Sequence, residues 1–288
     1  MRIEIRDLTF IYNQGAVFAK KALDNVNLDI ADGEFLGLIG HTGSGKSTLI
    51  QHMNALLKPA SGQVLLDGVD INSDKSLLKS VRRRVGLVFQ YPEHQLFEMT
   101  TREDVAFGPK NLGLHKDEAH ARAERAMKAV GLPADAWEKS PFELSGGQKR
   151  RAAIAGVLAM EPEVLILDEP TAGLDPRGRD EILGQIREMR EALGISVILV
   201  SHSMEDVARL ASRTVVMSEG KIAFSGTAAE VFERTEELEA IGLAAPKITY
   251  LMKSLESRGF EVPEGIFTVE GAGNAILEKI RSRKLEDR

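Results

Sequence analysis

The sequence of 288 residues contains no cysteine, which excludes disulfide bonds and thiolate chemistry and fits a reducing compartment. It also lacks a basic excess, because 43 Asp and Glu stand against 37 Lys and Arg, giving a net charge of -6. Nucleic-acid-binding proteins usually carry such an excess, so we expect no nucleic-acid partner. No apolar run approaches the length of a membrane span, and the first residues have no signal-peptide core. These absences favour a cytoplasmic or peripheral membrane protein.

The chain does contain a glycine-rich segment between a short apolar run, residues 35–39, and a predicted helix. It matches the pattern G-x-x-x-x-G-K-[ST] of nucleotide phosphate loops in the required setting of strand, loop and helix. Glycines allow successive backbone N–H groups to wrap a phosphate, and the N-terminus of the next helix adds partial positive charge. A glycine turn with a chance Lys-Ser pair is the alternative, which the strand–helix setting disfavours. The residues are Gly40, His41, Thr42, Gly43, Ser44, Gly45, Lys46, Ser47 and, at the start of the helix, Thr48.

Two adjacent carboxylates follow a fully apolar run, residues 164–167, which is typical of a buried parallel strand. Asp168 and Glu169 cannot belong to the core, because burying unpaired charge is costly. We expect Asp168 to hold Mg²⁺ opposite Ser47, and Glu169 to orient or deprotonate water. Lys46 is expected to reach the β- and γ-phosphates of the nucleotide.

Three further residues stand at or near the ends of predicted strands. Gln90 occupies a position where open α/β sheets place ligand-contacting groups. A lone histidine is more often structural, but His202 ends a strand parallel to the Asp168 strand and becomes a candidate γ-phosphate contact. Tyr12 could stack on an adenine face, and packing at the rim of a sheet is an equal alternative.

A second helix start with accessible backbone donors is predicted at Ser145. Ser145 is a good N-cap residue, and the glycines after it leave the first N–H groups of the helix open to an anion. A capped helix after a loop is the structural alternative. The segment consists of Leu144, Ser145, Gly146, Gly147 and Gln148.

The apolar pattern predicts an α/β domain over residues 1–235, with an antiparallel β subdomain and a helical insertion at about residues 95–160. Residues 236–288 are expected to form a small C-terminal appendage for subunit contact, the alternative being a tail that covers the sheet edge. Strands are predicted over 2–11, 23–30, 35–39, 63–66, 85–89, 164–167, 195–200, 215–217 and 222–224. Helices are predicted over 46–57, 101–112, 116–130, 134–139, from 173–176 to about 193, 227–234, 248–255 and 275–280.

The ordered set of motifs resembles the nucleotide-binding domain of the ATP-binding cassette (ABC) superfamily over roughly residues 2–235. The resemblance implies a P-loop NTPase fold, with ATP and Mg²⁺ as its ligands. It implies that Tyr12 stacks on adenine, that Gln90 senses the γ-phosphate and Mg²⁺, and that His202 contacts the γ-phosphate.

The same resemblance implies that Glu169 is the catalytic base and that Asp175 lies at a dimer interface. Residues 145–148 would then bind the ATP held by a second ABC ATPase, a paralogue or a second copy, in a head-to-tail dimer.

A narrower resemblance rests on the segments Phe89–Glu98, Asp104–Asn111 and Lys21–Asn27. These are similar to the ATPase subunits of energy-coupling factor transporters, which import vitamins and transition-metal ions, and most of all to the second of two paralogous ATPases. The resemblance implies a transmembrane coupling subunit, exchangeable substrate-binding membrane subunits, and a peripheral location on the cytoplasmic face of the cell membrane. The apolar pair Leu96 and Phe97 is the hypothetical docking surface.

Two other functions compete with this interpretation. A conventional ABC importer ATPase with its own solute-binding protein is disfavoured by residues 90–97. A soluble ABC ATPase that acts on DNA or ribosomes is disfavoured because the chain has neither a coiled-coil insertion nor a second cassette.

Overall fold

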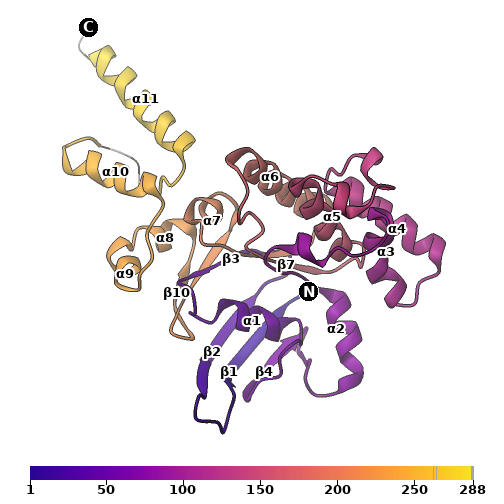
Figure 1. Ribbon diagram of the computed structural model, residues 1–288. Coiled ribbons are helices and arrows are strands. Elements are labelled where there is room, and N and C mark those ends of the chain that lie inside the picture. Colours follow the sequence, from indigo (N-terminus) through magenta and orange to yellow (C-terminus); the bar gives the residue numbers. More distant parts are fainter. Residues whose placement is uncertain (262, 264, 287–288) are drawn as a thin grey trace.

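The computed structural model describes residues 1–261, 263 and 265–286. Two β-sheets and helix α1 (Lys46–Met53) contribute side chains to one hydrophobic core. A second core lies among the six-stranded sheet and the helices that follow it in the chain. Figure 1 shows the smaller sheet with α1 on one side of the larger sheet and most of the helices on the other.

The larger sheet has six strands. They are β3 (Phe35–Gly40), β6 (Val85–Val88), β7 (Val164–Asp168), β8 (Ser196–Val200), β9 (Arg213–Ser218) and β10 (Lys221–Gly226). Their order is β10-β9-β3-β8-β7-β6, and all neighbours are parallel except β9 and β10. β3, β6, β7 and β8 are buried along their whole length, which explains their apolar runs. Because parallel strands end at one edge, the residues that follow them meet there.

The smaller sheet is antiparallel, as predicted. Its strands are β1 (Ile3–Tyr12), β2 (Lys20–Ile30), β4 (Ser61–Leu66) and β5 (Val69–Asp70), in the order β2-β1-β4-β5. β2 begins three residues before the predicted start, and Tyr12 ends β1 opposite Lys20. The short β5 was not predicted from the sequence.

The predicted helical insertion consists of α3 (Thr101–Asn111), α4 (Lys116–Ala129) and α5 (Gly146–Leu158), which pack on one another. No strand lies between β6 and β7, a stretch that the structure describes completely. Helices α6 (Pro176–Leu193) and α7 (Met204–Leu210) follow β7 and β8, so each predicted strand–helix unit is present.

Two helices predicted before residue 140 were too long by several residues. The segment 46–57 is helical only to Met53, because Asn54 turns its side-chain amide to the carbonyl of Val85 and Ala55 adopts a left-handed φ of 53°. The segment 134–139 contains only a 3-10 turn, Ala134–Ala136. Helix α2 (Leu78–Arg84) was missed altogether.

The last part of the chain is helical. It contains α8 (Ala228–Phe232), α9 (Thr235–Ala240), α10 (Lys247–Ser257) and α11 (Val269–Glu286). The three helices predicted there are present, α8 shorter and α10 and α11 longer than expected, and α9 was not predicted. In Figure 1, α11 extends away from the sheet domain. No helix among the described residues is both long and apolar enough to cross a bilayer.

Candidate nucleotide site

The phosphate loop joins the end of β3 to the start of α1 at the carboxyl edge of the larger sheet. Gly45 has a φ of 104°, and an added Cβ would lie 2.6 Å from the carbonyl oxygen of Ala22, so only glycine fits there. The Lys46 ammonium folds back over the loop and donates to the carbonyls of Gly40 (2.6 Å) and His41 (3.1 Å). Burial lowers the pKa of Lys46, while the carboxylates of Glu169 and Asp168 oppose that shift. The Lys46 ammonium thus donates only to neutral carbonyls, and a bound anion could take their place as its acceptor.

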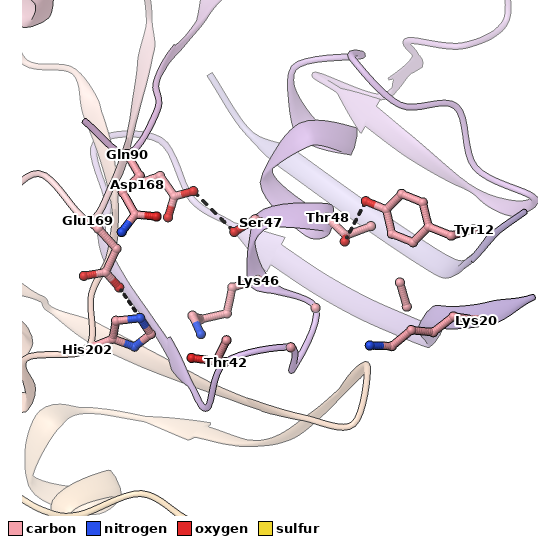
Figure 2. Close-up of a pocket in the computed structure, with 13 residues that line it drawn as sticks. Tyr12, Lys20, Thr42, Lys46, Ser47, Thr48, Gln90, Asp168, Glu169 and His202 are labelled. Atoms are coloured by element: carbon pink, nitrogen blue, oxygen red, sulfur yellow. Dashed lines mark hydrogen bonds and ion pairs between the residues drawn. The ribbon is translucent and has the colours of Figure 1, made fainter. Parts of the chain in front are cut away.

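Asp168 and Ser47, 121 residues apart in sequence, meet in this site. The Ser47 hydroxyl donates to Oδ2 of Asp168 at 3.3 Å, and Gln90 lies beside them (Figure 2). Burial raises the pKa of Asp168, and the hydrogen bond from Ser47 and the charge of Lys46 partly offset it. A hydroxyl, a carboxylate and an amide oxygen are the hard donors that Mg²⁺ accepts together with phosphate oxygens, so these residues fit that ion.

Glu169 follows β7 in a left-handed conformation, with a φ of 52°, and its N–H donates to Val200 on the neighbouring strand (2.9 Å). Its Oε1 lies 3.2 Å from Nε2 of His202, but the two groups are not aligned for a hydrogen bond. Burial, with a further contribution from the charge of Asp168, raises the pKa of Glu169 to about 7. The pKa of His202 is lowered by burial and by the charge of Lys46. The site therefore holds a carboxyl group that can accept a proton near neutral pH.

Tyr12 lies at the opposite end of the same cavity. Its hydroxyl is 3.2 Å from Oγ1 of Thr48, and its ring packs edge-to-face on Phe10 with centroids 4.9 Å apart. Tyr12 is 38% exposed, which leaves aromatic surface open to a base.

The cavity has a volume of about 300 Å³ and combines residues from both sheets. It is lined by Tyr12, Lys20, Ala22, Thr42, Gly43, Gly45, Lys46, Ser47, Thr48, Gln90, Asp168, Glu169 and His202. Lys20 and Ala22 were missed from the sequence. The hairpin that pairs Tyr12 with Lys20 is the signal that could have found the lysine. Three predicted loop residues, Gly40, His41 and Ser44, shape the loop without lining the cavity.

The segment at the start of α5 does not line this cavity. Ser145 is the N-cap, and its hydroxyl accepts from the N–H of Gln148 (3.3 Å) while the Gln148 side chain accepts from the N–H of Ser145 (3.0 Å). A Cβ added to Gly146 or Gly147 would meet nothing within 4 Å. The described chain therefore gives no steric reason for these two glycines.

Comparisons with known proteins agree with this geometry. Residues 23–172 match the family model described as ABC transporter. The energy-coupling factor transporter ATP-binding protein EcfA2 of Clostridium tetani is 58% identical over 96% of this chain and 97% of its own length. The EcfA2 of Geobacillus kaustophilus is 47% identical over 100% of both chains. The chain belongs to the ABC transporter family, among the ATP-binding proteins of energy-coupling factor transporters.

Solved structures of this ABC family share the fold. CbiO1 from Clostridium perfringens, part of the CbiONQ transporter complex, has a TM-score of 0.74 and 40% identity, covering 87% of this chain and 98% of that one. The dimeric ATP-binding cassette MJ0796 bound to ADP and Pi has a TM-score of 0.70 and 30% identity, covering 78% and 98%. The predicted fold class and the resemblance to second-paralogue ATPases are thereby confirmed.

Proposed function

We propose that this chain is the ATP-hydrolysing motor subunit of an energy-coupling factor importer and drives uptake of vitamins or metal ions through a partner transmembrane subunit. One observation carries the proposal. At the carboxyl edge of the larger sheet, Lys46, Ser47 and Asp168 gather in one cavity with Glu169, whose pKa is about 7. This set would hold a phosphate chain and Mg²⁺ beside a proton acceptor.

The residues divide the work of hydrolysis. Tyr12 stacks on the adenine, and Thr48 lies next to the Tyr12 hydroxyl near the start of α1. The loop N–H groups and Lys46 bind the phosphates, and Lys46 exchanges its two backbone acceptors for phosphate oxygens. Ser47, Asp168 and Gln90 would hold Mg²⁺, which neutralises charge on the β- and γ-phosphates.

Glu169 and His202 act at the γ-phosphate end of the cavity. Glu169 accepts the proton of the attacking water. His202, 3.2 Å from Glu169, contacts the γ-phosphate.

The second phosphate-binding element, residues 145–148, supports a head-to-tail dimer with a second ABC ATPase, a paralogue or a second copy. The start of α5 lies outside the chain's own cavity and is bare of side chains at Gly146 and Gly147. A helix N-terminus stabilises only an anion directly beyond it. The partner's ATP is therefore the anion that these residues would hold.

A docking surface for the transmembrane coupling subunit follows Gln90. Phe97 is 58% exposed, Met99 is 83% exposed, and the Phe97 ring packs edge-to-face on Phe107. The buried carboxylate of Asp104 fixes this segment by accepting from the N–H groups of Phe97 and Glu98 (2.9 and 2.8 Å). The predicted pair Leu96–Phe97 needs correction, because Leu96 is half-buried and packs against the core.

With such membrane partners, the chain would lie on the cytoplasmic face of the cell membrane, beside a coupling subunit that carries exchangeable substrate-binding subunits. The appendage, residues 236–288, is proposed as a further subunit contact, since its helices expose Leu251, Val269 and Leu277.

The test is reconstitution with the membrane subunits that co-purify with the chain. ATP hydrolysis and uptake into vesicles should both occur with the wild type, and both should stop with Glu169→Gln. ATPase activity without any co-purifying membrane subunit, or stimulated by ribosomes or DNA, would contradict the proposal.

The composite site has its own test, which uses Lys46→Ala and Ser145→Arg. With one change in each subunit, a single site is disabled twice and the other stays whole, so ATP should be trapped at one site per dimer. With both changes in one subunit, both sites are damaged and no ATP should be trapped. The reverse pattern, with no ATP trapped in the first arrangement and one ATP trapped per dimer in the second, would show that each chain works alone.

A further inference from the structure

Arg150 is a charged residue in the interior of the protein, on the first turns of α5. Only 2% of its surface is exposed, yet its guanidinium makes four hydrogen bonds. Nη2 and Nε donate to the two carboxylate oxygens of Glu93 at 2.7 and 3.2 Å. Nη1 donates to the carbonyls of Pro170 and Ala172 at 3.0 and 2.8 Å. A planar guanidinium can make these contacts together, whereas a lysine ammonium cannot.

These partners belong to parts of the site far apart in sequence. Glu93 lies in the 3-10 turn Pro92–Gln95, directly after the Gln90 segment. Burial opposes ionisation of Glu93, but the hydrogen bonds and charge of Arg150, with a backbone hydrogen bond and the charge of His94, together outweigh burial and hold the pKa of Glu93 below its ordinary value. Pro170 follows Glu169 directly, and the N–H of Ala172 donates to the carbonyl of Glu169 at 3.1 Å. Arg150 thus contacts both the turn that follows Gln90 and the segment 170–172 that follows Glu169.

The segment 170–172 is held from its other side as well. Oγ1 of Thr171 donates to Asp206 of α7 at 3.2 Å, and the buried carboxylate of Asp206 pairs with Arg179 at 2.7 Å. The left-handed conformation of Glu169 is unfavourable for a non-glycine residue, and it persists only because its surroundings fix it. Arg150 holds the segment 170–172 from one side, and Asp206 holds it from the other.

We propose that Arg150 is a positioning residue that couples the two ATP sites of the dimer. This inference rests on the composite sites of the proposed function. In such a dimer, the start of α5 binds the ATP of the partner, while Gln90 and Glu169 act on the ATP of this chain. A shift of α5 either carries Glu93 and the segment 170–172 with it or breaks their bonds to Arg150. Binding of ATP at one site therefore adjusts the hydrolytic residues of the other.

The experiment measures ATP hydrolysis against ATP concentration in the complete membrane complex. Arg150→Lys keeps the positive charge but removes the planar guanidinium that donates to both oxygens of Glu93. Glu93→Gln removes the negative charge and leaves the hydrogen bonds from Arg150 to the carbonyls of Pro170 and Ala172 in place. Arg213→Lys and Glu34→Gln are the matched controls. These two residues form an Arg–Glu fork of the same kind (2.7 and 3.3 Å), but Glu34 precedes β3 at the edge of the sheet opposite to the site.

We expect Arg150→Lys and Glu93→Gln to lower kcat about tenfold, a typical coupling between sites, and to bring the Hill coefficient to one. The double variant should be no worse than the more affected single variant, because both changes break the same contact. The affinity of the isolated chain for ATP should not change, and the control variants should keep both the wild-type kcat and the wild-type Hill coefficient. If Arg150→Lys does not fold, Glu93→Gln alone decides the test.

Two results would overturn the proposal. A cooperative wild type whose Arg150→Lys and Glu93→Gln variants are equally cooperative, even if they unfold at a lower temperature, refutes the role of Arg150 alone. A wild-type complex with a Hill coefficient of one refutes the composite sites and the role of Arg150 together.

Discussion

Replacing Glu169 by glutamine removes a buried negative charge, and we expect it to stabilise the nucleotide-free chain while it slows hydrolysis. Glu169 is 7% exposed and lies beside Asp168, so its ionised form is disfavoured. Raising the pKa from 4.5 to about 7 corresponds to a cost of about 3 kcal/mol for the ionised group in the folded chain. Glutamine has nearly the same shape and carries no charge.

The sign and the pH range follow from the two pKa values. Between pH 4.5 and about 7, the folded carboxyl keeps its proton while the unfolded one has lost it, so the stability of the wild type falls as pH rises. The glutamine variant does not titrate at this position. The gain in free energy of unfolding should be close to zero at pH 4.5 and should reach its full size, about 3 kcal/mol, by pH 8.

The assay is urea unfolding of both proteins at several pH values, with nucleotide and Mg²⁺ removed. Glu34→Gln is the control, because this glutamate is ion-paired with Arg213 away from the site and should give no such gain. A stability difference that does not change with pH, or a less stable Glu169→Gln chain at pH 8, would refute the reasoning. In the complete complex the same variant should still bind MgATP and hydrolyse it about 100- to 10,000-fold more slowly.

Three further predictions follow from the site. The kcat/KM for ATP should rise with pH through about 7, because Glu169 must lose its proton to act as a base, and Glu169→Gln should abolish that rise. Lys46→Ala should weaken ATP binding about 10- to 100-fold by calorimetry, since it removes a charge-assisted contact to phosphate, and an unchanged affinity would count against that role. Replacing both Phe97 and Met99 by serine should detach the chain from its membrane partner without changing ATP affinity, which co-purification and calorimetry would show.

The grouping of the main candidate site residues in one cavity could be predicted because strong local patterns place them. A fully apolar run of four or five residues is compatible with a buried parallel strand, and the polar residues that follow must then lie at one edge of the sheet. Lys46, Ser47, Asp168, Glu169 and His202 all line one cavity for this reason. Their proximity follows from the topology of the sheet and needs no knowledge of side-chain packing.

Features that depend on contacts between distant segments could not be predicted in this way. Helix α1 ends at Met53 because Asn54 bonds to Val85 across the core, although the apolar residues that follow are compatible with a longer helix. The segment after Pro133 is held by the Trp137 indole, which donates to the carbonyl of Leu132 at 3.1 Å, and forms only a 3-10 turn. The local sequence around Glu93 does not indicate that its partner is Arg150, 57 residues away in the chain.

The position of Glu169, the proposed base, is therefore set by residues outside its own strand. Val200 of β8 accepts the backbone N–H of Glu169, Arg150 of α5 binds the carbonyls of Pro170 and Ala172, and Asp206 of α7 accepts from Thr171. A motif in the sequence can supply the carboxylate, but these contacts decide whether its left-handed conformation is maintained. Helix α5 begins directly after Ser145, and α7 begins two residues after His202, so these contacts link Glu169 to both of the other segments that are proposed to bind phosphate. The geometry thus makes the base dependent on the closure of the dimer that is proposed to bring ATP and α5 together.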